Sequence, residues 1–118
     1  MIKSYYDLEI YKESYSLALQ IHEMTKAYPE YERYEIGSQL RRAALSIPMN
    51  IAEGYGKKDS IADFKRFLRM SLGSCNEVHV LIDMCRDLHY ISEEEHKKMW
   101  ESYDVLGKRI STVIAKWK

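Results

Sequence analysis

The residues best suited by type to chemistry are Gly54-Tyr-Gly-Lys-Lys58, near the middle of the chain. A phosphate-binding P-loop has the pattern G-x-x-x-x-G-K-[ST] after a strand, so that backbone N–H groups and a lysine surround the phosphate. Gly56 and Lys57 supply a Gly-Lys pair, but Ile51 stands where the first glycine belongs and Lys58 where Ser or Thr belongs. The segment therefore does not match a P-loop. We expect Gly54 to end a helix in the left-handed conformation, with both lysines near the negative helix end.

Potential metal ligands and nucleophiles are scattered along the chain. Three pairs have helical spacing: Glu93/His96, Cys75/His79 and Cys85/His89. A di-iron bundle needs Glu-x-x-His motifs on two helices, and the sequence has only one. The two Cys–His pairs are ten residues apart, or about 15 Å along one helix, which is too far to share an ion. No Ser–His–Asp or Cys–His–Asp motif is apparent either. We therefore predict no metal, no cofactor and no enzymatic activity.

Positive charge is concentrated between residues 41 and 69. This segment has seven basic and three acidic residues, whereas the segments on both sides are net negative. The bases are Arg41, Arg42, Lys57, Lys58, Lys65, Arg66 and Arg69. Clustered Lys and Arg neutralise phosphates and release counterions, so these residues are candidates for binding RNA or DNA. The alternative is an ordinary solvated hairpin. Since no RRM, KH or zinc-finger pattern is present, binding would be led by the backbone, with little sequence preference.

A polar stripe with apolar neighbours lies in the same region. Gln39, Arg42, Ser46, Asn50 and Glu53 follow a 3-4-4-3 spacing, with Leu45 and Met49 beside them. The stripe is either a solvated helix face or a hydrogen-bonded seam at an interface between copies of the chain. In the second case the interface residues are Gln39, Leu45, Met49 and Asn50. Ten tyrosines leave a similar choice between packing over helix ends and anchoring an interface.

Four amphipathic helices would carry these residues, over residues 7–27, 34–53, 60–89 and 92–117. The clearest pattern is the 4-3-4-3-4-3 spacing of Phe64, Leu68, Ser71, Cys75, Val78, Ile82 and Cys85. In the first helix, we expect Leu8, Tyr11, Tyr15, Ala18, His22 and Thr25 to face inward, flanked by Leu19 and Ile21. Pro48 should kink the second helix without ending it. Strand patterns are missing and connections are short, which predicts an all-α, up-and-down antiparallel four-helix bundle in one domain, 1–118.

The composition fits this architecture. The chain has 118 residues, 46% of them hydrophobic, and equal numbers of basic and acidic residues. Cys75 and Cys85 lie too far apart on one helix to form a disulfide, so we expect reduced thiols and a cytoplasmic protein. No apolar run is long enough to span a membrane, and the first residues lack the apolar core of a signal peptide.

Several motifs together carry a family likeness. They are Asp7-Leu8, Tyr28-Pro29, Glu32, the block QLRRAALSIPMNIAEG from Gln39 to Gly54, Phe64, Phe67-Leu68, Gly73-Ser74 and Glu77. In these motifs the chain resembles the four-helix-bundle family whose founding members are encoded in intervening sequences of bacterial large-subunit ribosomal RNA genes. Met49 stands where the family commonly has a small residue, and Tyr11 where it often has Trp.

The resemblance implies an up-and-down bundle that assembles into a ring-shaped homopentamer. The accessory variability protein of diversity-generating retroelements looks like a relative; it is a pentameric barrel that binds nucleic acid and a reverse transcriptase. The family has no established enzymatic activity. The implied partners are therefore further copies of the chain, RNA or DNA, and a reverse transcriptase. Together with the basic segment, the resemblance favours a non-enzymatic oligomer that binds nucleic acid. The alternative is an oligomeric interaction scaffold that does not.

Overall fold

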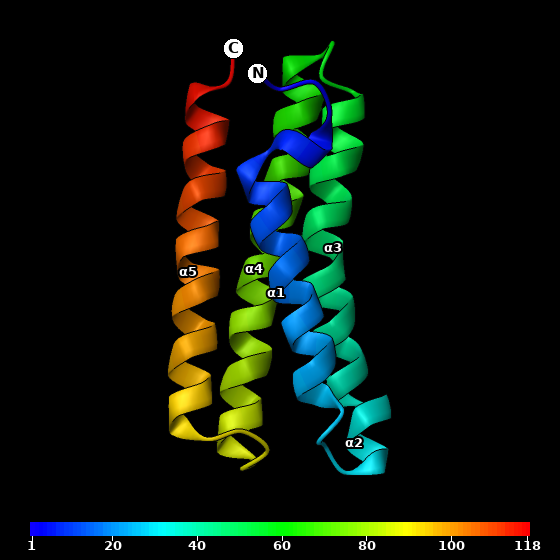
Figure 1. Ribbon diagram of the computed structural model, residues 1–118, viewed down its shortest axis with the longest axis vertical. Helices are drawn as coiled ribbons and strands as arrows, with labels where there is room; N and C mark the ends of the chain where they lie inside the picture. The colour runs from blue at the N-terminus through cyan, green and yellow to red at the C-terminus, as the bar shows by residue number, and fades with distance from the viewer.

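A computed structural model describes all 118 residues, and its regular elements are all helices (Figure 1). They are η1 (Tyr5–Asp7), α1 (Glu9–Thr25), α2 (Glu30–Tyr34), α3 (Ile36–Gly56), α4 (Ile61–Asp87) and α5 (Glu93–Lys116). The predicted all-α fold with four long helices is confirmed. The short helix α2 was not predicted; it follows Pro29, whose fixed φ suits the start of a helix. None of the helices is both long and apolar enough to cross a membrane.

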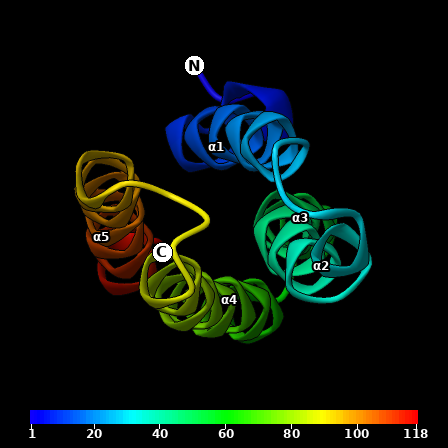
Figure 2. The same cartoon turned by 90° about the horizontal axis from the view of Figure 1, so that it is seen from below.

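The four long helices run up and down along the longest dimension of a bundle measuring 45 × 23 × 21 Å. Viewed along its length, they follow one another around the bundle in the order α1, α3, α4, α5 (Figure 2). Between neighbouring long helices, contact is most extensive for α3 and α4 and least extensive for α1 and α5. A surface groove, lined by Leu17 and Val105 among others, follows this α1–α5 seam. Both chain termini lie at the same end of the bundle (Figure 1).

The core follows the predicted face on α4 fully and that on α1 only in part, since Leu8, Ala18, Ile21 and Thr25 are buried as expected. All seven residues of the α4 pattern are buried. On α1 the buried stripe is Ile10, Ser14, Leu17, Ala18, Ile21 and Thr25. The inward placement of Tyr15, Leu19 and His22 was therefore wrong, and all three are exposed. The helix is rotated so that its aliphatic stripe, rather than its aromatic one, faces the core.

Of the four predicted helix starts, those at Ser60 and Ser92 are confirmed and the one at Asp7 is corrected; α3 begins at Ile36, two residues after its predicted start. Ser60 accepts a hydrogen bond from the Asp63 N–H at the start of α4 (3.2 Å), and Ser92 caps α5 in the same way. Asp7 was predicted to begin the first long helix. It instead lies in η1, where its carboxylate accepts the Lys3 and Ser4 N–H groups and holds the turn before α1.

The expected left-handed glycine at position 54 is a second correction. Gly54 lies inside α3, and no glycine in the chain has a positive φ. A Cβ at this position would lie 2.7 Å from the Phe67 Cβ, so glycine is needed here because α3 and α4 approach closely. Pro48 is also inside α3, which continues past it as expected and ends at Gly56, three residues beyond the predicted Glu53. The one positive φ belongs to His89 (64°), in a Schellman turn that ends α4.

Candidate nucleic-acid interface

The turn between α3 and α4 presents two lysines at one end of the bundle. The Lys57 and Lys58 N–H groups donate to the carbonyls of Gly54 (2.9 Å) and Tyr55 (3.1 Å), which fixes the backbone of the turn. The Lys58 Nζ lies 4.6 Å from the centre of the Tyr55 ring, and the Lys57 Nζ lies 5.6 Å from that of Phe67. Both side chains are exposed and neither pairs with a carboxylate. The turn therefore offers two free cations to an anionic ligand.

The first turns of α4 bring three more of the predicted bases to the same end. Arg66 lies over the Phe67 ring, 4.6 Å from its centre, and its Nε is 3.7 Å from an Asp63 carboxylate oxygen. Lys65 and Arg69 have no carboxylate partner. Five of the seven predicted bases are thus brought together here.

The other two predicted bases, Arg41 and Arg42, lie well away from this end. Helical rise places Arg42 about 22 Å along the bundle from Lys57. Arg41 donates to the Thr25 hydroxyl (3.0 Å) and to the Arg33 carbonyl (2.8 Å), so its guanidinium links α3 to α1 and α2. Arg42 is exposed, but it stands apart from the other five bases.

Sequence reasoning overlooked the bases at the end of α5. Trp117 packs against Phe64, with ring centres 4.8 Å apart, so the C-terminal turn of α5 lies beside the start of α4. This brings Lys108, Arg109, Lys116 and Lys118 to the half of the bundle that holds the basic turn. The predicted antiparallel topology could have located these bases. A fourth helix antiparallel to the third must end at the end of the bundle where the third begins, beside the turn between the second and third helices.

Charge is consequently segregated along the bundle axis. Leu17, Ser46, Ser74 and Val105 each lie near the middle of their long helix, and we divide the bundle at these four residues. The Ser46 and Ser74 hydroxyls are 2.5 Å apart, and Leu17 and Val105 line one groove, so the residues of each pair lie at the same level. The half that contains both termini, residues 1–17, 46–74 and 105–118, has 11 basic and six acidic residues. The opposite half has seven basic and 12 acidic residues. A chain of zero net charge thus has one half at +5, here called the basic half, and one at −5, the acidic half.

The predicted interface residues are divided between an internal seam and an exposed surface. Asn50 is half-buried and donates to the Ser46 carbonyl (2.8 Å), while the Ser46 hydroxyl meets Ser74 of α4. The centre of the polar stripe is therefore engaged within one chain. Gln39 is exposed, as are Leu45 and Met49, the latter at 60%. The assignment of these residues to an interface between copies stays a prediction.

Two buried thiols and two buried tyrosine hydroxyls are held in their neutral forms. Burial raises the pKa of the Cys75 thiol to about 12, and it also raises the pKa of the Cys85 thiol. Burial likewise raises the pKa of the Tyr28 and Tyr103 hydroxyls. No three His, Cys, Asp or Glu side chains are grouped closely enough to hold a metal ion.

Comparison with known proteins places these features in a family. Residues 6–112 match the family described as 23S rRNA-intervening sequence protein. A crystal structure of a protein of unknown function from the S23 ribosomal protein family of Bacteroides thetaiotaomicron superposes with a TM-score of 0.81 at 23% identity, covering 89% of this chain and 97% of that one. This likeness shows a shared fold. No curated protein matches the sequence.

Proposed function

Since this chain belongs to the 23S rRNA-intervening sequence protein family, we propose that it is a non-enzymatic, homo-oligomeric helical protein that binds RNA or DNA through its basic half. The observation that carries the proposal is the excess of free bases there. Seven basic residues of that half have no acidic partner: Lys3, Lys57, Lys58, Lys65, Arg69, Lys116 and Lys118. Only two of its acids, Glu53 and Asp59, lack a hydrogen-bonding or ion-pair partner.

The form of this surface favours contacts to the phosphate backbone. Its bases lie on a turn, on the first turns of α4 and at the end of α5, and their long side chains can adjust to phosphates at different positions. No single helix gathers them along one face, as a helix that reads base edges in the major groove would. Such contacts position a nucleic acid without selecting its sequence.

The oligomer we propose is the ring-shaped homopentamer that the family resemblance implies. In a cyclic ring every protomer has the same orientation relative to the axis, so equivalent surfaces repeat around one assembly. Repeating a modest basic surface raises its overall affinity for a long polyanion, because the second contact is made at high effective concentration. A reverse transcriptase as a protein partner rests on the resemblance alone.

A second candidate function is an oligomeric interaction scaffold without nucleic acid. The observation that favours it is the set of exposed aliphatic side chains Leu19 on α1 and Leu45 and Met49 on α3. Exposed apolar groups of this kind gather at protein–protein contacts. The two candidates share the oligomer and differ only in whether the basic half binds phosphates.

Fluorescence anisotropy with a labelled RNA or DNA oligonucleotide separates the candidates. We expect binding that weakens about a thousandfold between roughly 50 and 200 mM salt, the change that six phosphate contacts would cause. The variant Lys57→Ala/Lys58→Ala should bind more weakly, with a salt slope reduced by about two. Lys97→Ala/Lys98→Ala, a matched control that removes the same charge from the acidic half, should bind like the wild type.

Two results would decide against parts of the proposal. No binding at low salt would refute the nucleic-acid function and favour the scaffold. Multi-angle light scattering tests the ring, for which the expected mass is about five times the 14.0 kDa of one chain. A mass of one chain would refute the oligomer in both candidates.

A further inference from the structure

Four tyrosines form a continuous cluster at the start of the chain. The rings of Tyr5 and Tyr6 are stacked, with centres 4.3 Å apart and planes inclined by 27°. Tyr11 meets Tyr5 edge-on at 4.9 Å and Tyr6 at 5.8 Å. Tyr15 continues the series along α1, 5.9 Å from Tyr11. We call these four residues the tyrosine cluster.

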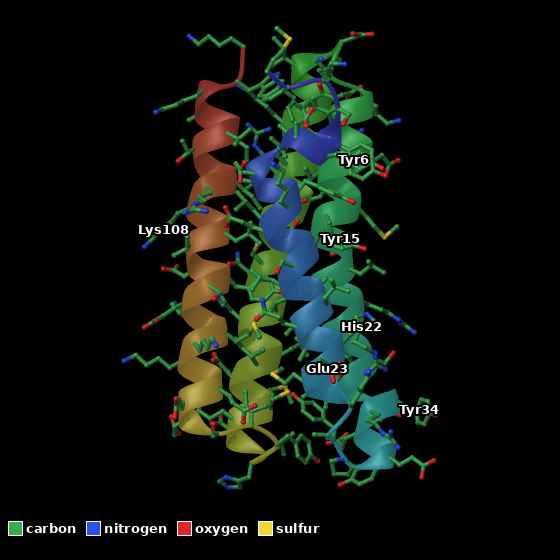
Figure 3. The ribbon with its side chains drawn as sticks, viewed as in Figure 1. Tyr6, Tyr15, His22, Glu23, Tyr34 and Lys108 are labelled. Atoms are coloured by element: carbon green, nitrogen blue, oxygen red, sulfur yellow. The ribbon has the colours of Figure 1, made fainter.

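Packing leaves two of the four rings open to a ligand. Tyr5 and Tyr11 are half-buried against the core, whereas Tyr6 is 61% exposed and Tyr15 50% exposed. Figure 3 shows Tyr6 and Tyr15 on one face of the bundle, beside α3. The inner rings thus support the outer ones, which reduces the freedom that an aromatic side chain would lose on binding a planar group.

The tyrosine cluster lies in the basic half, and the three acidic residues near it in sequence are paired within the chain. The Asp7 carboxylate accepts two backbone N–H groups, Glu9 pairs with Lys12, and Glu13 accepts from Arg109. The bases Lys3, Lys57 and Lys58 in the same half have no such partner. An anionic ligand would therefore meet exposed aromatic rings and free cations in the same half of the molecule.

We propose that the tyrosine cluster stacks on unpaired bases of single-stranded RNA or DNA while the free lysines of the basic half bind its phosphates. This inference rests on the proposed function and specifies its ligand class. Aromatic side chains combined with a basic surface are how proteins bind single strands without sequence preference, because every base has a face that can stack. A duplex hides those faces between neighbouring base pairs, so it could use the lysines but not the tyrosines.

The test compares three probes of one sequence: an unstructured RNA, the same strand as DNA, and the DNA duplex. Wild-type protein should bind both single strands more tightly than the duplex. Tyr6→Ala/Tyr15→Ala should lower affinity for the single strands at least about fivefold, the smallest loss expected when a stacked base loses its partner. Its affinity for the duplex should not change. Tyr6→Phe/Tyr15→Phe keeps the rings and should bind like the wild type, as should Tyr31→Ala/Tyr34→Ala, a control pair of exposed tyrosines in the acidic half.

Each contrary result has a distinct meaning. Equal affinity for duplex and single strand, or unchanged single-strand binding by Tyr6→Ala/Tyr15→Ala, overturns this inference but leaves the proposed function intact if Lys57→Ala/Lys58→Ala still weakens binding. A loss in the Phe variant as large as in the Ala variant means that the hydroxyls act rather than stacking. A smaller mass of the Ala variant in light scattering assigns the cluster to a protein interface and also overturns the inference. Absence of binding to all three probes refutes the proposed function itself.

Discussion

Replacing Gly54 with alanine tests the close approach of α3 and α4 that positions the basic turn. Alanine would place a methyl group 2.7 Å from the Phe67 Cβ, 3.1 Å from the Phe64 Cδ1 and 3.3 Å from the Phe64 carbonyl oxygen. The first contact involves an atom fixed to the backbone of α4, and the third is a backbone oxygen. The two helices must therefore move apart to accept the methyl group, and a side-chain rotation alone does not relieve the contact.

The expected loss follows from two opposing effects. An alanine inside a helix is about 1 kcal/mol more favourable than a glycine. Overpacking a filled interior costs about 1–3 kcal/mol, and a contact below 3.0 Å to backbone-fixed atoms belongs in the upper part of that range. Gly54→Ala should thus lower the free energy of unfolding by about 1–2 kcal/mol.

Gly73→Ala is the matched control, since it makes the same chemical change in the middle of α4. No atom lies within 4 Å of the Cβ it would add, so it should raise stability by up to about 1 kcal/mol. Urea unfolding followed by circular dichroism at 222 nm measures both variants, with equal m values as the check that only stability has changed. The reasoning is refuted if Gly54→Ala is as stable as the wild type or shifts in the same direction as Gly73→Ala.

Three further predictions concern the supports of the bundle. Arg41→Ala should lower the free energy of unfolding by about 1–3 kcal/mol, because it removes two hydrogen bonds that join α3 to α1 and α2. Replacement of the exposed Arg42 by alanine is the control and should change it by less than about 0.5 kcal/mol. Equal effects of the two substitutions in urea unfolding would contradict this prediction. His89→Gly should raise stability by about 1 kcal/mol, since its φ of 64° is unfavourable for a side chain, and a lower melting temperature would be the opposite result. The pKa of Cys75 is raised from 9.0 to about 12 in the native state, so its contribution to stability is fully present below pH 9.0. This contribution is lost as pH rises toward about 12, and the free energy of unfolding should fall over that range. The buried thiol should also resist alkylation by iodoacetamide at pH 8 until urea unfolds the protein.

The sequence predicted the buried face of α4 accurately and that of α1 only in part, for a physical reason. On α4, Phe64, Leu68 and Val78 belong to one long stripe of apolar or small residues. The exposed apolar residues Met70, Val80 and Met84 form a shorter series that Glu77 interrupts. On α1, two stripes have helical spacing: an aliphatic one that contains Ile10 and an aromatic one that contains Tyr15. Tyrosine suits both a core and a surface, so periodicity alone does not say which stripe faces inward.

The candidate site shows a similar division. The free lysines of the α3–α4 turn could be found from sequence, because a Gly-Tyr-Gly break followed by Lys57 and Lys58 places charge at a helix end. That Arg41 is engaged internally could not be found, since its partner Thr25 is 16 residues away and belongs to another helix. The bases at the end of α5 were missed because charge was summed along the chain. Positions that are distant in sequence, such as Lys58 and Lys116, share one half of the folded bundle.

Cross-linking mass spectrometry of the protein bound to a photoreactive single-stranded oligonucleotide tests the central claim most directly. The claim is that segregated charge gives this neutral chain one nucleic-acid-binding half. We predict cross-linked peptides from residues 1–17, 46–74 and 105–118. Cross-links concentrated in residues 18–45 and 75–104 would contradict it.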